Sequence, residues 1–336
     1  MRTPVAFIIF NRPDVSARVF AEIARARPRT LLVIADGPRP DHPLDVERCA
    51  AARAVIDRVD WDCEVLKNYS DENLGCGRRP ATGLSWVFDQ VEEAIVLEDD
   101  CFPHPTFFRF CEEMLEKYRD DERVMHVSGD DFLTRKRGER FSYFFSCYCL
   151  SWGWATWRRA FQHYDRQIQL WPTLRDTSWL SETLGDPEAV LHWQRIFDRV
   201  YKEGEASDVW DFQWLFTIWA RHGLAILPNA NLVSNIGFGE DATHTKGVKN
   251  NLSHLPLREM MFPLQHPLRV ARDHKTEQAI FKQLIGASRP ALYRQLCGRI
   301  AAALFSTLRS RVRDGSLLST ALRRARLISG TGYQER

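Results

Sequence analysis

Three consecutive acidic residues, Glu98, Asp99 and Asp100, are the clearest candidates for chemistry in this sequence. They directly follow the apolar run 94–97, which is typical of a strand buried on both faces of a parallel sheet. Neighbouring carboxylates repel one another at neutral pH, and a divalent cation relieves that repulsion. Hard oxygen ligands favour Mn²⁺ or Mg²⁺. The pattern therefore indicates a metal site at the carboxyl end of a strand, where open α/β sheets bind ligands, with an acidic surface turn as the alternative.

Two further segments contain residue types that suit sugar chemistry. Trp152 and Trp154 flank a glycine in the aromatic-rich stretch 141–157, which is typical either of core or of a loop that offers flat apolar faces to a sugar ring. Asp211 follows Trp210 in the first turn of a predicted apolar helix. Because the helix dipole stabilises a carboxylate there, Asp211 is either a simple helix-start residue or a general base.

The elements that must position these residues alternate between strand and helix. The predicted strands are residues 5–10, 30–35, 63–68, 94–97, 124–129 and 225–228. The first predicted helix begins near Asp14, and further helices cover about residues 45–59, 80–90, 106–117 and 188–202. A last predicted helix contains Trp210, Trp214 and Ile218, with Ser207 as its N-cap and Gly223 at its end. This alternation predicts an α/β fold with a mostly parallel sheet between helices. The sequence has no G-x-G-x-x-G after its first strand and no P-loop, which argues against those two nucleotide sites.

Composition sets the outer limits. The 336 residues are 44% hydrophobic and 27% charged, as in a globular protein with one large or two smaller domains. The eight cysteines are scattered and only Cys147 and Cys149 are close, which predicts buried free thiols rather than a zinc site. Pro4 and residues 11–13 interrupt the first apolar run too early for a secretory signal, and no run is long enough to span a bilayer. We therefore expect a cytoplasmic protein.

Residues 287–336 form a basic tail. This tail contains ten arginines and two acidic residues, and apolar residues recur at every fourth position from Leu292 to Leu308. A basic amphipathic helix of this kind either lies on an anionic membrane surface or packs back on its own domain. Membrane contact through the tail would make the protein peripheral on the inner face of the membrane. Nucleic acid is not an expected partner, because the positive charge is confined to the tail and no recognition motif accompanies it.

Several motifs together resemble those of a known family. Residues 94–100, Phe107, Phe108, Lys117, Asp120 and 127–128 resemble the metal-motif region of GT-A-fold glycosyltransferases, most closely the N-acetylglucosaminyltransferase I family. The element 151–154, Trp210-Asp211 and the glycine-rich loop 235–244 follow in that family's order, so the resemblance covers about residues 4–246. It implies a GT-A-like domain at 1–250, with a nucleotide-binding half at 1–130 and an acceptor and catalytic half at 131–250. A linker and helix at 251–286 and the tail at 287–336 would then form a C-terminal helical extension.

The resemblance also implies an activity and a set of roles. The activity is metal-dependent, inverting transfer of a sugar from a nucleotide diphosphate sugar to a hydroxyl of a saccharide or glycolipid acceptor. The expected nucleotide is UDP, and N-acetylglucosamine is one candidate for the sugar. Mn²⁺ (or Mg²⁺) would be bound by Asp100, with His244 of the late loop as a further ligand, and Asp211 would be the general base. The donor would contact Phe10, Asn11, Arg12, Asp36, Arg79, Glu98 and Asp99. The acceptor would contact Trp152, Trp154 and Trp210.

General chemistry fits these roles. A leaving nucleoside diphosphate develops negative charge that a divalent cation and arginines stabilise without moving a proton, and inversion needs one base on the opposite face of the sugar. Two other classes stay open: a sugar-nucleotide nucleotidyltransferase, which would use the same sheet and metal to make the donor, and a non-catalytic carbohydrate-binding protein, which would keep the tryptophans without the chemistry.

Overall fold

The computed structural model describes residues 1–133, 140–237 and 255–288 of the chain. The chain divides into one compact unit, residues 1–283, and a second unit, residues 284–336. All contacts described below belong to the first unit. The predictions for His244, for most of the late loop and for the basic tail fall on residues outside the described ranges, so they stay predictions.

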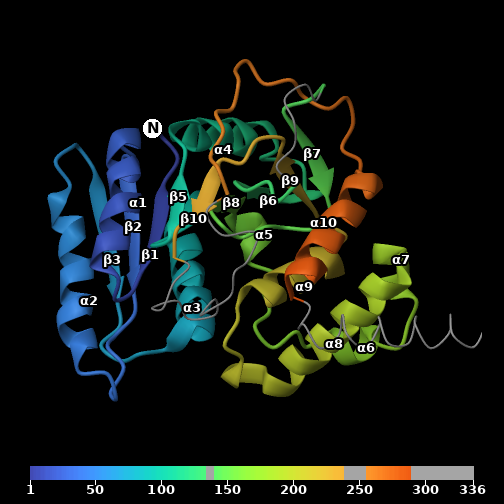
Figure 1. Ribbon diagram of the computed structural model, residues 1–336, viewed down its shortest axis with the longest axis horizontal. Coiled ribbons are helices and arrows are strands. Elements are labelled where there is room, and N and C mark those ends of the chain that lie inside the picture. The colour runs from blue at the N-terminus through green and yellow to red at the C-terminus, as the bar shows by residue number, and fades with distance from the viewer. Residues whose placement is uncertain (134–139, 238–254, 289–336) are drawn as a thin grey trace, which may run out of the picture. The chain divides into compact units, whose positions relative to one another are not determined.

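An eight-stranded mixed sheet forms the centre of the first unit, with the order β3-β2-β1-β4-β8-β6-β9-β7 (Figure 1). β1 pairs in parallel with β2 and β4, and β6 pairs in parallel with β9. β8 and β7 run antiparallel to their neighbours. The strands are β1 (Val5–Ile9), β2 (Thr30–Ala35), β3 (Glu64–Tyr69), β4 (Glu93–Glu98), β6 (Val124–Ser128), β7 (Tyr143–Ser146), β8 (Trp154–Trp157) and β9 (Leu224–Pro228). The predicted α/β class with a mostly parallel sheet is confirmed, and the two antiparallel strands come from the aromatic-rich stretch 141–157.

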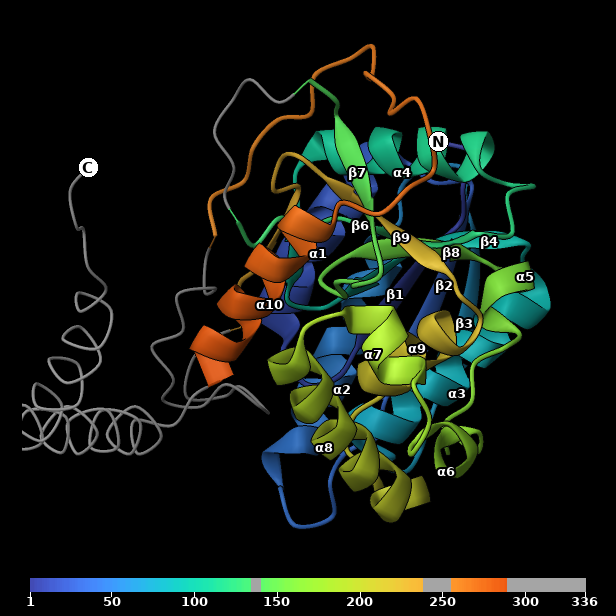
Figure 2. The same ribbon diagram turned by 90° about the vertical axis from the view of Figure 1, so that its right-hand side faces the viewer.

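Helices cover both faces of this sheet. They are α1 (Pro13–Ala26), α2 (Leu44–Ala54), α3 (Gly75–Gln90), α4 (Pro105–Lys117), α5 (Arg158–Phe161), α6 (Trp171–Leu174), α7 (Trp179–Leu184), α8 (Pro187–Glu203), α9 (Asp211–Ala220) and α10 (His274–Ser288), with short 3₁₀ turns at Val55–Arg58 and Gly204–Ala206. Figure 2 shows the sheet between α4 on one side and α3 and α9 on the other. None of the described helices combines the length and apolar composition that a membrane span needs.

Alternation of side chains along each strand decides which helix covers which face. Val5, Phe7 and Ile9 of β1 belong to the same buried cluster as the apolar residues of α1 and the aromatic residues of α4. Ile34 of β2 points to the other face, where a Cβ added to Gly83 of α3 would lie 2.5 Å from its side chain. The sheet is therefore buried on both faces, as continuous apolar strands predict.

Two predicted helix starts differ from the structure. α3 begins at Gly75 rather than Pro80, so Pro80 lies inside the helix and the expected loop 70–77 is shorter. Gly77, in the first turn of α3, packs against the Ser207 backbone, because a Cβ there would lie 2.2 Å from the Ser207 carbonyl oxygen. Ser207 itself does not cap α9, since the cap position is Trp210 and no side-chain cap bond forms there.

A second, two-stranded sheet crosses the edge of the large one. β5 (Cys101–Pro103) follows the acidic residues directly and pairs in an antiparallel sense with β10 (Val233–Asn235). The register places Asn235 opposite Cys101. The start of the late glycine-rich loop is thus held beside Asp100 by backbone hydrogen bonding.

The described residues of the predicted linker, 255–283, pack on the same unit. The backbone N–H of Met260 donates to Thr106 Oγ1 of α4 at 3.0 Å. Arg272 forms an isolated bridge with Phe145 of β7 and an ion pair with Glu277 of α10 at 2.8 Å. Over these residues the chain belongs to the compact unit rather than to a free linker.

Candidate functional site

The acidic residues lie where the strand order of the sheet reverses. β2 is on one side of β1 and β4 on the other. The chain therefore continues from β1 toward β2 and from β4 toward β6, in opposite directions along the sheet. The register pairs Ile8 of β1 with Glu98 of β4, which brings the residues after both strands to one edge. Open α/β sheets bind ligands in the crevice at this switch point. The structure brings Arg12 into contact with Asp99 and Asp100, and Asn11 precedes Arg12 in the chain. The predicted donor-binding and metal-binding roles of these residues stay predictions.

Arg12 joins two of the three carboxylates. Its Nη1 lies 3.1 Å from Asp100 Oδ2, and its Nε donates to Asp99 Oδ2 at 3.3 Å, while Nη2 pairs with Asp99 Oδ1. Asp99 is buried, whereas the side chains of Arg12 and Asp100 keep 22% and 16% of their surface. One guanidinium thus neutralises part of the cluster and stays partly exposed.

The cluster carries more negative charge than Arg12 balances. Burial raises the pKa of Glu98, and the charges of Asp100, Asp99 and Asp211 raise it further. Burial also raises the pKa of Asp99, against the opposing effect of Arg12. Burial lowers the pKa of Arg12, but the attraction of Asp99 and Asp100 outweighs it and the net shift is upward. Groups of this kind, buried beside like charges, favour binding of a cation.

Gly237 closes one side of this cluster. The Ile236 N–H donates to the Asp100 carbonyl at 2.8 Å, and the Gly237 N–H donates to Asn235 Oδ1 at 2.9 Å. A Cβ added to Gly237 would lie 2.3 Å from Asp100 Oδ2 and 2.6 Å from Arg12 Nη1. Only glycine lets the backbone approach the ion pair this closely. The sequence analysis did not single out Gly237, although the glycine content of the loop was the available signal.

Asp36 is at the same edge, after β2, and its hydrogen bonds hold a loop together. Its Oδ1 accepts from the N–H groups of Gly37 and Leu74, both at 2.9 Å. Its Oδ2 accepts from the N–H of Gly75 at 2.9 Å and from Asn73 Nδ2 at 3.1 Å. Asp36 therefore fixes the start of α3 beside the crevice, and its predicted contact with the nucleotide base stays a prediction.

Arg79 lies beneath this loop and is buried. Its Nε donates to the Ala35 carbonyl at 3.1 Å, and its Nη2 donates to Asn68 Oδ1 at 2.7 Å. Burial lowers the pKa of Arg79, and Asp36 opposes this effect. In this structure Arg79 ties β2 to β3, so a donor contact would require it to exchange one of these partners.

Phe10 and Asn11 belong to a polar network that the sequence analysis missed. Asn11 Nδ2 donates to Asp45 Oδ1 at 2.7 Å, and Arg39 Nε donates to Asp45 Oδ2 at 2.6 Å. The Arg39 guanidinium carbon lies 5.5 Å from the centre of the Phe10 ring. The side-chain hydrogen bond from Arg39 lowers the pKa of the buried Asp45 to about 2. Arg39 and Asp45 thus position two predicted donor-binding residues.

Asp211 is the first residue of α9, and its side chain is half-buried. Its Oδ1 accepts from the Phe212 N–H at 3.0 Å, in agreement with a carboxylate near a helix start. Its charge raises the pKa of Glu98, so the two carboxylates lie within electrostatic range of each other. A segment more than 100 residues later in the sequence therefore returns to the acidic cluster.

The predicted acceptor-binding tryptophans differ in exposure. Trp154 of β8 is fully buried, and its ring stacks between those of His126 and Trp210. The expectation that Trp154 contacts an acceptor does not fit this structure, because its side chain has no surface to offer. Trp210 keeps 6% of its surface. Trp152 is partly exposed and packs against Phe132, so it keeps a surface for a sugar.

The chemistry of the cluster suits a hard divalent cation. The carboxylate of Asp100 is partly exposed, and its neighbours are further carboxylates. Among the described residues, no three His, Cys, Asp or Glu side chains form a ready-made metal site. Mg²⁺ and similar ions are often held by one or two carboxylates together with substrate phosphates, and the residues present fit this mode. The seven described cysteines are free thiols, but only four of them are buried: Cys63, Cys76 and Cys149 are partly exposed.

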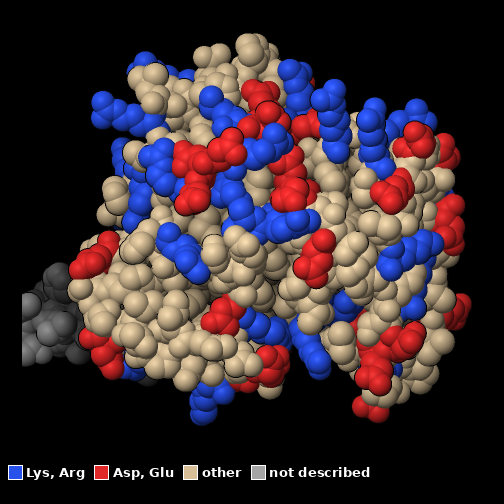
Figure 3. All heavy atoms as spheres, turned by 180° about the vertical axis from the view of Figure 1, so that it is seen from behind, with Lys and Arg blue, Asp and Glu red and all other residues tan. Residues whose placement is uncertain are grey.

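Charged side chains of both signs are interspersed on the face drawn in Figure 3. Among the described residues drawn there, no broad area of one sign is visible. Nucleic-acid-binding proteins carry a continuous basic patch or stripe. This face offers none.

Comparisons with solved structures find only distant similarities. No known family model and no curated protein matches it. The Staphylococcus aureus TarS 1–349 structure aligns with a TM-score of 0.37 and 11% identity over 68% of this chain and 58% of that one. Mouse xyloside xylosyltransferase 1, in its apo form, aligns with a TM-score of 0.32 and 13% identity over 64% and 81%. A UDP-glucose pyrophosphorylase complexed with UDP-glucose aligns with a TM-score of 0.24 and 11% identity over 43% and 66%.

The chain spans 58% of the length of the TarS structure that it matches. Likenesses at these TM-scores and identities carry no argument about activity. Membership of the N-acetylglucosaminyltransferase I family stays a prediction.

Proposed function

We propose that this protein is a glycosyltransferase that uses a nucleotide diphosphate sugar as donor. The observation that carries the proposal is the pairing of Arg12 with Asp99 and Asp100 at the switch point of the sheet, within the electrostatic range of Asp211. Buried carboxylates that exceed their local positive charge suit a cation-bridged diphosphate, and a separate carboxylate suits proton removal from an acceptor.

The donor would lie along the carboxyl edge of the sheet. Its diphosphate would lie near Asp100 and the exposed edge of Arg12, which would release part of its ion pairing to meet the phosphates. The nucleoside would extend over the ends of β1 and β2, where Phe10, Asn11 and the loop held by Asp36 lie. The sugar would point the other way, toward α9. This orientation would bring the sugar toward Asp211, because Trp210, the residue before it, stacks on Trp154 of β8.

Mn²⁺ or Mg²⁺ is the proposed cofactor, held by Asp100 together with donor phosphates. Such an ion, when bound, supplies positive charge that stabilises the leaving nucleoside diphosphate. Glu98 and Asp99 would contact the donor ribose and sugar. Asp211 would take the proton of the acceptor hydroxyl on the face opposite the leaving group, which gives inversion. The proposal also names UDP as the nucleotide, N-acetylglucosamine as one candidate sugar, and a saccharide or glycolipid as the acceptor.

Donor turnover tests the proposal directly. We expect the full-length protein to release nucleoside diphosphate from at least one member of a panel of UDP-sugars when Mn²⁺ is present, and to lose this activity when the metal is chelated. Asp100→Asn should abolish metal-dependent donor binding in a calorimetric titration and leave the melting temperature nearly unchanged. Asp198→Asn is a matched control, because Asp198 of α8 also pairs with an arginine, Arg175, at 2.7 Å.

Three outcomes separate the candidate classes. Release of nucleoside diphosphate supports transfer. Formation of a UDP-sugar from UTP and a sugar phosphate would instead show a nucleotidyltransferase. Saccharide binding without any metal-dependent nucleotide binding would indicate a carbohydrate-binding protein and refute the proposal.

A further inference from the structure

Asp211 is the first residue of α9, a helix that has no exposed polar face to indicate how it packs against the rest of the protein. Residues 213–219 of α9 are all buried, so the helix has no polar face to turn toward solvent. The hydrophobic effect itself is non-directional. Directional contacts of α9 are therefore the most informative about where Asp211 lies relative to the acidic cluster.

Two indole hydrogen bonds supply this direction. Trp214 Nε1 donates to His126 Nδ1 at 3.1 Å, and Trp219 Nε1 donates to the Cys147 carbonyl at 2.7 Å. The two tryptophans lie five residues apart, so they fix both the rotation of the helix and its position along its axis. Both acceptors are buried, and their bonds are made far from solvent.

The acceptor side of each bond is itself fixed. His126 Nε2 lies 3.0 Å from the Leu150 carbonyl, so it must carry the proton, and Nδ1 is left as the acceptor for Trp214. Burial lowers the pKa of His126 to about 3, which keeps the ring neutral. The Leu150 N–H donates to Ser128 Oγ at 3.0 Å, which ties this segment to the end of β6.

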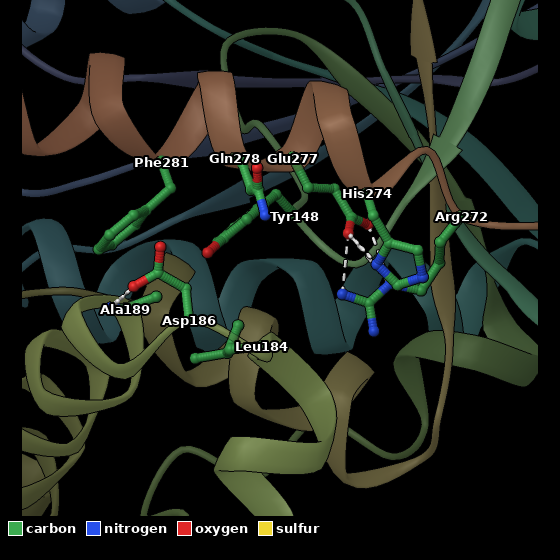
Figure 4. A pocket seen from close by; sticks show the side chains of 9 residues that line it. All are labelled: Tyr148, Leu184, Asp186, Ala189, Arg272, His274, Glu277, Gln278 and Phe281. Carbon is green, nitrogen blue, oxygen red and sulfur yellow. Dashed lines mark hydrogen bonds and ion pairs between the residues drawn. The ribbon is translucent and has the colours of Figure 1, made fainter. Parts of the chain in front are cut away.

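The other end of the same segment is held by α10. The Cys147 N–H donates to Glu277 Oε1 at 2.6 Å, and Glu277 pairs with Arg272 at 2.8 Å. Figure 4 shows Glu277 and Arg272 joined beside the small pocket between α10 and the start of α8. Residues 147–150 are thus anchored at both ends, and Trp219 of α9 donates to the Cys147 carbonyl between these anchors.

A column of stacked rings reaches the residue before Asp211. The Trp154 ring lies 5.0 Å from that of His126, with an angle of 14° between their planes. It lies 5.6 Å from the Trp210 ring on its other side, at 24°. The Tyr164 hydroxyl donates to the Trp210 carbonyl at 3.1 Å. His126 therefore contacts α9 directly through the Trp214 bond and is linked to Trp210, the residue before α9, through the Trp154 ring.

We propose that His126, Trp214 and Trp219 are positioning residues that set the register of α9 and so hold Asp211 at the distance from the donor site that sugar transfer needs. This inference rests on the proposed function only for its kinetic consequence, because the register of α9 is a property of the protein alone. A misplacement of about 1 Å in a catalytic group can cost about 10²-fold in rate.

The test removes buried indole N–H hydrogen bonds at two places in the fold, on α9 and on β8, and compares the effects. Trp214→Phe and Trp219→Phe each remove one bond to α9 and keep an aromatic ring. Trp157→Phe is the matched control, because Trp157 of β8 is equally buried and its Nε1 donates to the Leu115 carbonyl at 3.2 Å. Trp157 pairs with Glu93 at the opposite end of β4 from the acidic cluster. All three variants lose a similar bond, so they should lose similar stability.

We expect Trp214→Phe and Trp219→Phe to lower kcat at least 10-fold without changing the KM for donor, and Trp157→Phe to leave both within 2-fold. Independently of any substrate, hydrogen exchange of the amides of residues 211–220 should be at least 10-fold faster in the double variant Trp214→Phe/Trp219→Phe than in Trp157→Phe. Equal exchange in these two proteins would overturn the inference, whatever substrate the protein takes. Faster exchange with no turnover in any variant or in the wild type would uphold the register and refute the proposed function.

Discussion

Acidification from pH 7 to pH 5 is expected to destabilise this protein through His126. The side chain is fully buried, and the groups that contact its ring in the described structure are the Trp154 and Trp214 rings and the Leu150 carbonyl, none of which is charged. Burial lowers the pKa of His126 to about 3, whereas an unfolded histidine titrates near 6.5. Between these values the unfolded chain binds a proton that the folded protein does not.

The sign and size of the effect follow from this difference. Because the unfolded state binds more protons, the free energy of unfolding falls as the pH falls through this window. The contribution is fully present above about pH 6.5 and declines by about 1.4 kcal/mol per pH unit below it. From pH 7 to pH 5 the loss is about 2 kcal/mol, and it is nearly the same for any folded-state pKa below about 4. Such a loss is a large fraction of the stability of a typical domain.

Urea denaturation at pH 5, 6, 7 and 8 measures this effect when wild type is compared with His126→Gln. Glutamine does not titrate, and its amide can donate toward Leu150 and accept from Trp214. The variant should be less stable than wild type at pH 7, and this difference should shrink by about 2 kcal/mol at pH 5. All other titrating groups are common to both proteins, so their contributions cancel in the comparison.

His163→Gln is the control, because His163 is only partly buried, whereas His126 is fully buried. Its stability difference from wild type should change much less with pH. The reasoning is refuted if the difference between wild type and His126→Gln is the same at pH 5 and pH 7. If His126→Gln is too unstable for a full denaturation curve, Trp214→Phe should reduce stability and keep the wild-type slope with pH.

Three further outcomes are expected. Asp211→Asn should keep donor affinity and lower kcat by about 10²- to 10⁴-fold, as expected for a lost general base. Kinetics and calorimetry on the same preparation measure both quantities. Turnover within a few-fold of wild type would remove Asp211 from the mechanism. Gly237→Ala should weaken donor binding at least 10-fold, because its Cβ would lie 2.3 Å from Asp100 Oδ2 and 2.6 Å from Arg12 Nη1. Unchanged donor affinity would show that the backbone at residue 237 can move to accept the methyl group. Through residues 287–336, the full-length protein should sediment with anionic vesicles and not with neutral ones. The bound fraction should fall as salt is raised, because salt screens the attraction over a Debye length of about 8 Å. Binding that does not depend on salt would contradict this expectation.

The sequence by itself determined the strands that carry the site and the place of the acids on them. An apolar run followed by Glu98, Asp99 and Asp100 forms β4 because four consecutive apolar residues need burial on both faces of a sheet. The same reasoning gave β1, β2 and the α/β class, and it placed Arg12 and Asp36 just after their strands. Each of these conclusions depends on residues within a few positions of one another, where spacing alone is informative.

Tertiary structure decided which of these residues are free to meet a ligand. Asp36 is committed to residues 73–75, and Arg79 to β2 and β3, by partners that no local pattern marks. Trp154 and its neighbours suited either core or a sugar platform by composition, and only the pairing of β8 between β4 and β6 buried it. α3 begins five residues earlier than predicted, at Gly75, where the Leu74 and Gly75 N–H groups donate to Asp36 from a distant segment.

The placement of Asp211 shows the physical reason most clearly. Local sequence identified a carboxylate at the start of an apolar helix, but such a helix has no amphipathic pattern from which its docking can be read. Its register depends on Trp214 finding a buried histidine 88 residues earlier in the chain and Trp219 finding a carbonyl 72 residues earlier. Hydrophobic burial is proportional to area and has little direction, whereas a hydrogen bond requires one atom at one distance and angle. The pattern of apolar residues therefore determines that α9 is buried, and the three-dimensional positions of its few polar partners determine where Asp211 lies.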